Sequence, residues 1–404
     1  MKLRFAKWLG WVLLAACSTE ATAPSKSPEV PSEPPSEPKL TFVPIRLGVS
    51  RATDFEFLPG TADELLVITQ AGKVQHSRIN ANQATTLGAG TLSVFDEAGC
   101  GLLSMAFDPE FASNGYVYFG RCRDALTSTL SRYELGSLAA LEASESEIMS
   151  ISVESMPPEL WHRWGSLGFE PDGQTMWALH GDMFVRDLAQ DVTTRHGSLL
   201  RFAPNREPGG SGYTTVPGNA VDTISNAEPT VYSYGLRSPW RGYRDSNGRF
   251  WVGDVGLETT EEVDLISEPA QNLGWPGAEG ACQVACQSLT DPLLSFGRSS
   301  EDPYVIEDPD TEPATKRAVW VGAGYEAPSV DRYYGLLDGM VPYGDFFTGW
   351  VRGVRVDDDG TVTTDRLLGH LTEVTSVKLG PDGYLYLLTL GGTLYRAQQV
   401  LEPI

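Results

Sequence analysis

The sequence predicts an all-β protein built as a six-bladed β-propeller with long inter-strand loops. The chain has 42 glycines and 27 prolines among its 404 residues, which favours many short strands joined by turns over long helices. One pattern also recurs six times: an apolar strand, a turn that carries Pro, Asp or Gly, and a second strand rich in aromatic residues. A single blade cannot bury both faces of its sheet, so the ring must fold as one unit. A pair of β-sandwiches is the alternative, but it does not explain six versions of one motif.

Each copy of the pattern has its own turn residue, and the three residue types serve different purposes. Proline presets φ, aspartate caps the turn, and glycine accepts a positive φ. The copies are centred on Pro59, Pro109, Pro171, Asp245, Asp338 and Pro381. We expect the strand at 41–48 (TFVPIRLG) to complete the last blade and close the ring. The long insertions at 203–230 and 277–318 are expected on one face, where propellers commonly build their sites.

The first residues predict export from the cell. Three basic residues precede an apolar run at 8–16 that is too short to span a bilayer. The run ends in Leu-Ala-Ala-Cys, which resembles the lipobox of bacterial lipoproteins, so Cys17 would be the lipidated first residue of the mature protein. By the same resemblance, Ser18 implies an outer-membrane lipoprotein of a Gram-negative-type cell, facing the periplasm or the cell surface. The alternative is an ordinary signal peptide with a chance cysteine.

The segment after the signal peptide differs in composition from the rest of the chain. Residues 17–40 are rich in proline, serine and glutamate and have almost no large apolar side chain, so they cannot bury enough surface to order themselves. The sequence therefore predicts a signal peptide at 1–16, a tether at 17–40 and a propeller at 41–404. The net charge of −23 argues against a nucleic-acid partner, because such binding depends on concentrated Lys and Arg.

Four cysteines remain in the chain after Cys17. An even number in an exported protein suggests two disulfides, which we place at Cys100–Cys122 and Cys282–Cys286. The first two flank what looks like an adjacent strand pair, and the second two close a small loop. A metal site is the competing interpretation, but the pairs have no Cys-x-x-Cys spacing and no nearby histidine.

One stretch of the sequence indicates which family of enzymes the protein resembles. Residues 234–276 read YGLRSPWRGYRDSNGRFWVGDVGLETTEEVDLISEPAQNLGWP. This order resembles the glucose/sorbosone dehydrogenase family, whose members read approximately GLRNPWR, GDLWIGDVGQ, EEIN and NYGWP. The family consists of soluble quinoproteins that hold pyrroloquinoline quinone (PQQ) in a six-bladed β-propeller. The resemblance covers most of residues 42–400 and implies the same fold and cofactor here.

A second segment, LWHRWGSLGFEPDGQTMWALHGD at 160–182, also resembles the family. By this resemblance His162 is the catalytic base, which takes the proton from the sugar C1 hydroxyl as hydride moves to the quinone. Histidine suits the role because its unperturbed pKa lies near working pH. The alternative is a loop histidine that bonds the neighbouring backbone.

Arg237 and Ser238 fall on the family's cofactor-binding Arg-Asn pair. A guanidinium suits PQQ because its fork can bind a carboxylate or the ortho-quinone oxygens bidentately. Ser238 would replace the family asparagine as a shorter donor. The alternative is that Arg237 caps a strand or pairs with Asp254.

The acidic run after this strand aligns with the family's calcium loop. By resemblance the backbone carbonyls of Gly256 and Leu257 would hold Ca²⁺, and Glu258 or Glu262 would supply a carboxylate to this ion or to a structural one. A solvated acidic turn is the alternative on so acidic a protein.

The chain also departs from the family. A pair of family arginines that precedes the last blade's turn is replaced by Glu373 and Thr375, and Glu326 stands where some members carry a cofactor-binding lysine. Anions around the three carboxylates of PQQ are unfavourable in a dry site. The basic residues Arg352, Arg355, Lys316 and Arg163 are candidates to restore the charge.

Two functional interpretations follow. In the first, a membrane-tethered enzyme uses PQQ and Ca²⁺ to oxidise an aldose to its lactone and passes electrons to a periplasmic acceptor. In the second, the propeller has lost its quinone and binds a glycan or a protein. No Ser-His-Asp order or paired-carboxylate spacing supports a hydrolase.

Overall fold

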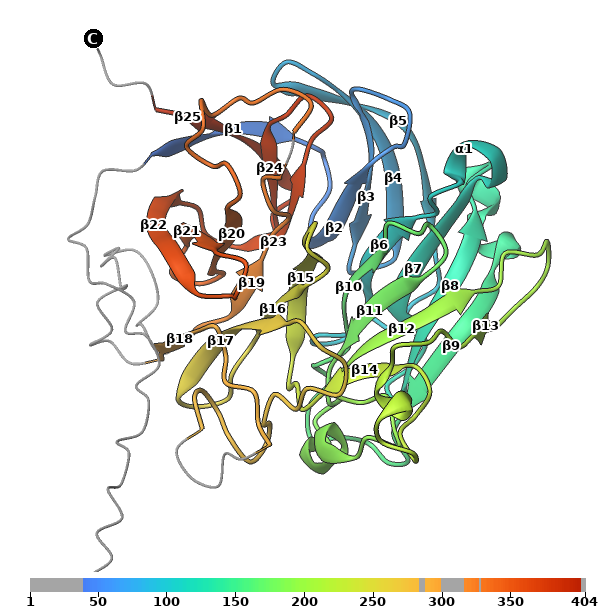
Figure 1. Cartoon of the computed structure of the whole chain (residues 1–404). Helices are drawn as coiled ribbons and strands as arrows, with labels where there is room; N and C mark the ends of the chain where they lie inside the picture. The colour runs from blue at the N-terminus through green and yellow to red at the C-terminus, as the bar shows by residue number, and fades with distance from the viewer. Residues whose placement is uncertain (1–38, 283–287, 299–315, 327, 401–404) are drawn as a thin grey trace, which may run out of the picture.

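The computed structural model describes residues 39–282, 288–298, 316–326 and 328–400, and these form six antiparallel four-stranded blades around one axis (Figure 1). Their strands are, blade by blade, β2 (Ala52–Phe57), β3 (Glu64–Thr69), β4 (Lys73–Asn80), β5 (Gln83–Thr91); β6 (Leu102–Phe107), β7 (Tyr116–Cys122), β8 (Thr127–Glu134), β9 (Ser146–Ser152); β10 (Trp164–Phe169), β11 (Met176–His180), β12 (Ser198–Pro204), β14 (Val231–Tyr234); β15 (Pro239–Arg244), β16 (Phe250–Asp254), β17 (Thr260–Ile266), β18 (Leu294–Gly297); β19 (Val319–Val321), β20 (Val341–Asp345), β21 (Trp350–Val356), β22 (Val362–His370); and β23 (Val374–Leu379), β24 (Leu385–Thr389), β25 (Thr393–Gln399), β1 (Leu40–Arg46). The fold prediction is confirmed.

Short elements interrupt the connections between strands. They are α1 (Phe111–Asn114), η1 (Leu138–Ser144), η2 (Arg186–Gln190), η3 (Ala220–Asp222) and the two-residue strand β13 (Tyr213–Thr214), which pairs with β12. Each of the six predicted turns lies between the first and second strand of a blade. The repeat read from the sequence is therefore the inner hairpin of each blade.

The ring is closed by the strand that the sequence places there. β1 pairs antiparallel with β25 over its whole length, from Leu40↔Gln399 to Arg46↔Thr393, and Ile45 is fully buried. A parallel contact, Arg46↔Gln83, then joins β1 to β5 of the first blade. In Figure 1 the blue β1 accordingly lies beside the red β25, so the last blade contains both ends of the propeller.

The six inner strands begin at the same end of the ring. Arg241, on β15, shows this for four of them, because its side chain reaches across the axis to the second residue of three other inner strands. Its guanidinium donates to the carbonyls of Thr375 and Thr53 at 2.7 Å each and of Leu103 at 3.0 Å. Arg241 thus ties four blades together at the axis. We call the end where β2, β6, β10, β15, β19 and β23 begin the start face.

One predicted placement is wrong. The insertion at 203–230 does not lie on the start face, because β12 runs away from that face before the insertion begins. Its Arg206 donates to Asp108 and to the carbonyl of Gly173 at 2.7 Å each, and both of these lie at inner hairpin turns. The second insertion, 277–318, is described only at 277–282, 288–298 and 316–318.

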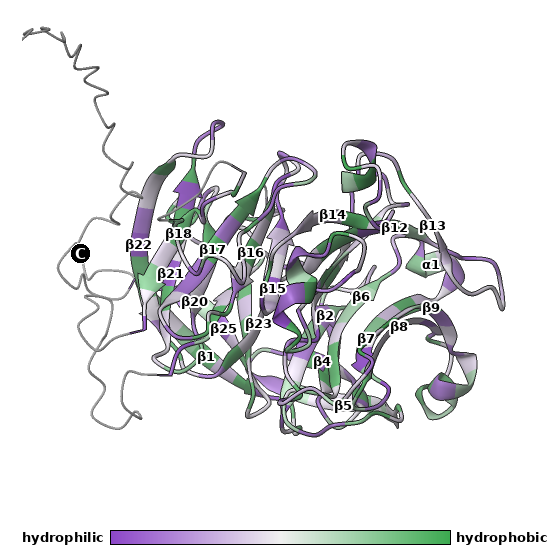
Figure 2. Cartoon of the chain, turned by 90° about the horizontal axis from the view of Figure 1, so that it is seen from below, coloured by the Kyte–Doolittle hydropathy of each residue, from purple (hydrophilic) through white to green (hydrophobic). Residues whose placement is uncertain are grey.

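Hydrophobic residues line the strands of the sheets, while hydrophilic residues are more frequent in the loops (Figure 2). The packed residues between blades include Trp164, Trp251, Trp320 and Trp350, all with at most 2% of their surface exposed. Within the described residues, no helix has the length and apolar character needed to cross a membrane. The predicted signal peptide, the lipidated Cys17 and nearly all of the tether lie outside the described residues.

The predicted disulfide between Cys100 and Cys122 is not formed in the structure, which has both as free, buried thiols. The two thiols lie within hydrogen-bond reach of each other, and this contact lowers the pKa of Cys100, while burial raises the pKa of Cys122. They pack in an apolar cluster with Trp164 and Leu130, where a free cysteine behaves as a small hydrophobic residue. The Cys282–Cys286 pair stays a prediction, since Cys286 lies outside the described residues.

Candidate active site

His162 lies on the start face, two residues before β10, and a buried aspartate holds its ring. The His162 Nδ1 atom is 2.6 Å from Oδ1 of Asp182, and Oδ2 of Asp182 accepts a hydrogen bond from the indole N–H of Trp275 at 2.8 Å. The backbone N–H of Phe184 donates to the same carboxylate at 2.8 Å. Since Asp182 accepts at Nδ1, that nitrogen carries the proton and the lone pair of the neutral ring is on Nε2.

The surroundings of His162 keep the imidazole neutral. Burial is the largest effect and lowers the pKa of His162 below its usual 6.5, while the contact with Asp182 opposes this shift. Burial alone would raise the pKa of Asp182, but the hydrogen bonds from His162 and Trp275 leave it lowered. The site therefore pairs a neutral imidazole with a carboxylate, which is the state required of a general base.

The backbone around His162 is held in unusual conformations. His162 has φ of 59°, and Met183 and Phe184 have φ of 53° and 62°. The ring of Phe184 stacks on the imidazole, with centroids 4.1 Å apart. Gly181 lies so close that a Cβ atom there would be 2.7 Å from the His162 carbonyl oxygen. Such left-handed backbone is uncommon for residues other than glycine and often occurs at functional sites.

Arg237 lies on the same face, two residues before β15, and Asp254 fixes its backbone. The N–H groups of Arg237 and Ser238 donate to the two oxygens of Asp254 at 2.7 and 2.6 Å. The Arg237 side chain donates through one terminal nitrogen to the carbonyls of Val255 and Gly256. Its Nε atom is buried and has no hydrogen-bond partner in the described part of the chain. A buried guanidinium with an unused donor is a candidate ligand-binding group.

Trp275 brings a second arginine to this place. The guanidinium carbons of Arg237 and Arg186 lie 5.4 and 5.6 Å from the centroid of the Trp275 ring, and Arg237 is also 6.0 Å from the ring of Phe184. Trp275 in turn holds Asp182 through its indole N–H. His162, Asp182, Trp275 and Arg237 therefore form one connected group, drawn from four loops.

The backbone N–H groups of the predicted calcium loop bind an internal carboxylate. The backbone N–H groups of Leu257, Glu258, Thr259 and Thr260 all converge on Oε1 of Glu279, at 2.6 to 3.3 Å. The carbonyl of Gly256 accepts from Arg237 and from Arg298 at 2.7 and 2.9 Å. A cation at this carbonyl would meet two guanidinium groups, so Gly256 does not fit a calcium ion in this arrangement. The Glu258 side chain is exposed.

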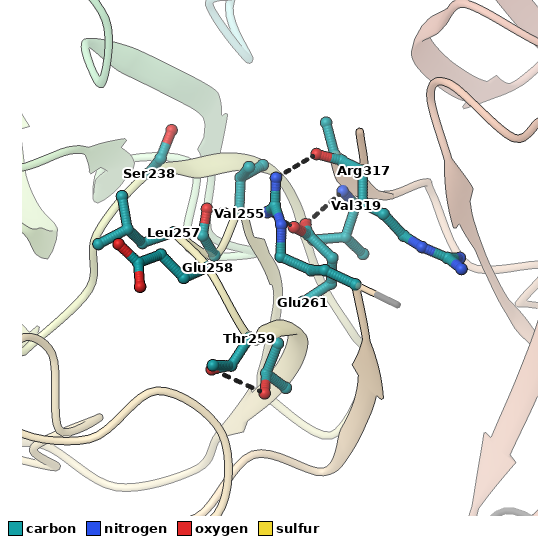
Figure 3. A network of polar contacts seen from close by, with 12 residues as sticks. Ser238, Val255, Leu257, Glu258, Thr259, Glu261, Arg317 and Val319 are labelled. Carbon is teal, nitrogen blue, oxygen red and sulfur yellow. Dashed lines mark hydrogen bonds and ion pairs between the residues drawn. The ribbon is translucent and has the colours of Figure 1, made fainter. Parts of the chain in front are cut away.

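Arg298 connects this loop to the fifth blade. It pairs with Glu261, whose other oxygen accepts the backbone N–H of Val319 at 2.9 Å. Figure 3 shows Glu261 between the loop and the start of β19, with Ser238, Leu257 and Glu258 grouped at one side. Burial raises the pKa of Glu261 to about 8 despite the opposing effect of Arg298. The network fixes the loop between two blades.

Three other carboxylates form a buried cluster beside the same loop. Glu262 and Asp264 are two residues apart on β17 and share one face of the sheet, and Asp254 is the register partner of Glu262 on β16. Their oxygens lie within 4.8 Å of one another. Both oxygens of the fully buried Asp264 have no hydrogen-bond partner among the described residues. Burial is the main reason that the pKa values of all three carboxyl groups rise: to about 7 for Asp254, to about 8 for Glu262, and well above the usual value for Asp264. Hard oxygen ligands in this arrangement fit a divalent cation such as Ca²⁺.

The acids predicted to oppose an anionic cofactor are only partly at the site. Glu373 is exposed on the start face, directly before β23. Thr375 is buried, and its hydroxyl donates to the carbonyl of Leu388. Glu326 accepts from Tyr243 and from the N–H of Ser246 at 3.0 and 2.9 Å, which places it at the opposite end of the inner strands.

Three of the four basic residues suggested as replacements are engaged with other groups than His162. Arg352 donates to Asp365 on the neighbouring strand, Arg355 donates to the carbonyl of Asp338, and Arg163 donates to the carbonyl of Ala125. The sequence reasoning missed Arg186, Asp182 and Trp275. Asp182 stands in the Gly-Asp that ends the second family-like segment, and Trp275 stands in the Gly-Trp-Pro turn. Both motifs therefore marked these positions in the sequence, but neither indicated what the side chain does.

Comparison with known proteins identifies the family of the chain. The family model described as "Glucose / Sorbosone dehydrogenase" matches residues 49–396. The aldose sugar dehydrogenase YliI of Escherichia coli is 24% identical over 346 residues, covering 82% of this chain and 85% of its own.

Two solved structures share the fold. The soluble aldose sugar dehydrogenase of Escherichia coli in its apo form has a TM-score of 0.69 at 18% identity and covers 89% of this chain and 100% of its own. The PQQ-bound aldose sugar dehydrogenase of Streptomyces coelicolor has a TM-score of 0.67 at 20% identity and covers 91% of this chain and 99% of its own. With a family model matched over nearly the whole propeller, the chain belongs to the glucose/sorbosone dehydrogenase family of sugar-oxidising enzymes.

Proposed function

We propose that the protein is a PQQ-dependent aldose sugar dehydrogenase that oxidises an aldose to its lactone. One observation carries the proposal: the neutral His162, oriented by Asp182, lies in a group connected through Trp275 to Arg237, whose buried Nε has no hydrogen-bond partner among the residues that the structure describes. A base and a cation for an anionic cofactor are thus built into one site.

His162 and Asp182 supply the proton chemistry. Asp182 holds the Nδ1–H, so Nε2 is free to take the proton of the sugar C1 hydroxyl. The carboxylate also stabilises the imidazolium that forms when this proton arrives. PQQ, if bound, would supply the acceptor for the C1 hydride, and a periplasmic acceptor would then take up the two electrons.

Arg237, Ser238 and Arg186 would hold the cofactor. PQQ is planar and carries three carboxylates, so it suits two guanidinium groups beside an aromatic ring. Arg186 is exposed beside Trp275 and would replace part of the charge that the family's missing arginines supply. Ser238 follows Arg237 with its N–H bonded to Asp254 and its hydroxyl available as a donor.

We assign calcium to the cluster of Asp254, Glu262 and Asp264 and not to the carbonyls of Gly256 and Leu257. Arg237 lowers the pKa of Asp254, but among the described residues no cation is a main influence on the pKa of Glu262 or of Asp264, so these two buried carboxyl groups have little compensating positive charge. Asp254 also binds the backbone of Arg237 and Ser238, and an ion here would therefore steady the cofactor-binding turn.

A second candidate function rests on Glu373. This exposed acid stands on the start face where the family has an arginine. A propeller that has lost PQQ and binds a glycan or a protein is the alternative that this residue favours.

Calorimetric titration of PQQ into the purified protein, with and without Ca²⁺, decides between the two. We expect binding that is lost in Arg237→Met and kept in Arg249→Met, whose arginine lies at the opposite end of the same blade. His162→Gln should keep binding and lose aldose oxidation with a dye acceptor. Absence of binding at high micromolar PQQ would rule out the enzyme and leave the recognition module.

We also infer that Cys17 anchors the protein to the outer membrane through its lipid, with residues 18–40 as the tether. The lipobox-like sequence supports this placement. Labelling of cells with a radioactive fatty acid should mark the wild-type protein and not Cys17→Ser.

A further inference from the structure

Trp161, the neighbour of His162, is exposed in a way that its surroundings do not explain. It has 49% of its surface exposed, whereas the other tryptophans among the described residues are buried or half-buried. A large aromatic side chain kept in solvent beside a functional residue is a common feature of binding sites. Leu160, directly before it, packs against the apolar cluster that includes Trp164.

The indole is held in place from one side. The six-membered part of the ring lies against Gly99 so closely that a Cβ atom there would be 2.4 Å from a ring carbon. The loop that carries Gly99 is itself fixed, because the side-chain amide of Gln70 donates to the carbonyls of Ala98 and Cys100 at 2.6 Å each. Part of the ring is therefore in contact with a fixed backbone, and about half of the residue's surface remains exposed.

Trp161 and the cofactor-binding residues lie on opposite sides of His162 in the order of the blades. Trp161 contacts the loop before β6 of the second blade, whereas Trp275 and Arg237 belong to the fourth. A base that takes a proton from the sugar while hydride moves to the cofactor must lie where sugar and cofactor meet. The side of His162 away from Arg237 is then the side of the sugar.

We propose that Trp161 is a sugar-binding residue, against which the apolar C–H face of a pyranose ring stacks while its C1 hydroxyl meets His162. An indole suits this partner because it offers a large apolar area at low conformational cost. The inference rests on the proposed function, since it names how the same site holds its substrate.

The test compares Trp161→Ala and Trp161→Phe with two matched controls. Met156→Ala removes an exposed apolar side chain from the same loop (63% exposed), and Tyr334→Ala removes an exposed aromatic ring from a turn between β19 and β20 (81% exposed). We expect Trp161→Ala to raise KM for the aldose about tenfold with kcat nearly unchanged, which is the effect of losing about 1.4 kcal/mol of binding. Trp161→Phe should restore most of the loss, and the two controls should match the wild type.

Two further measurements separate this inference from the proposed function. PQQ affinity, measured by calorimetry, should be the same in Trp161→Ala and the wild type; a weaker PQQ affinity with unchanged KM would show that the ring stacks on the cofactor, and overturn the inference. If the wild type binds no PQQ, the proposed function fails, and direct calorimetric titration of pyranose monosaccharides still tests Trp161. Equal sugar affinity in Trp161→Ala and the wild type would then overturn the inference as well.

Discussion

The imidazole of His162 and the carboxylate of Asp182 are 2.6 Å apart, although 20 residues separate them in the chain. Asp182 follows β11 and His162 precedes β10, so the antiparallel pairing of these two strands brings both to the start face. The indole of Trp275 completes the arrangement from the fourth blade. The pair is the clearest chemical feature of the molecule, and it gives the first prediction.

Asp182→Asn should lower kcat for aldose oxidation by about 10²-fold, because a neutral amide has no charge to stabilise the imidazolium and its NH2 group can donate to Nδ1, which favours the wrong tautomer. Since burial lowers the pKa of His162, the wild-type enzyme should keep its active, neutral base below pH 6.5 and lose activity only as pH falls through the lowered value. Asp182 opposes that shift, so the acid limb should move to still lower pH in the variant.

A profile of kcat against pH measures both effects. Asp187→Asn is the matched control, because Asp187 lies on the same connection in the exposed helix η2. An unchanged acid limb in Asp182→Asn would contradict the assignment of His162 as the base.

Arg241→Met should destabilise the ring as a whole. The substitution leaves the buried carbonyls of Thr53, Leu103 and Thr375 without their donor, and we expect a loss of about 3 kcal/mol in the free energy of unfolding. Denaturation by urea, followed by tryptophan fluorescence, measures this loss. Arg355→Met removes an arginine whose one described hydrogen bond is exposed, so it should change the midpoint little. Equal midpoints for the two variants would show that Arg241 does not connect the blades.

The sequence predicted the propeller because each inner hairpin carries its own turn residues, which are local signals. It also singled out His162 and Arg237, since each stands in a contiguous motif, and the structure places both on the start face. The prediction that Glu326 lies near the cofactor was wrong. From the sequence alone it cannot be read that Glu326, which follows β19, lies at the end of that strand opposite to the start face. Trp275 and Asp182 are 93 residues apart, and they meet only because the third and fourth blades pack side by side. The Gly256 carbonyl shows the same limit, since its two arginine donors come from different parts of the chain.

The thiols of Cys100 and Cys122 should behave as buried, reduced cysteines. Neither has exposed surface, and burial raises the pKa of Cys122, so alkylation of the native protein should be slow. After unfolding in urea without reductant, both should react with iodoacetamide, and peptide mapping should find each modified. Recovery of a peptide pair linked through Cys100 and Cys122 would instead support the disulfide first expected from the sequence.

Asp264→Asn should make the protein less dependent on calcium. With Ca²⁺ at a hundredfold excess over Kd, we expect the thermal midpoint of the wild type to rise by about 4 °C over its value in chelator. In chelator, Asp264→Asn should melt above the wild type, because it removes a buried carboxylate whose oxygens have no partner among the described residues. It should gain little from added Ca²⁺, since a ligand charge is lost. Glu258→Gln changes the exposed part of the loop and should respond to Ca²⁺ like the wild type. If that variant instead lost the stabilisation by Ca²⁺, the calcium site would have to be assigned to the loop at 256–258.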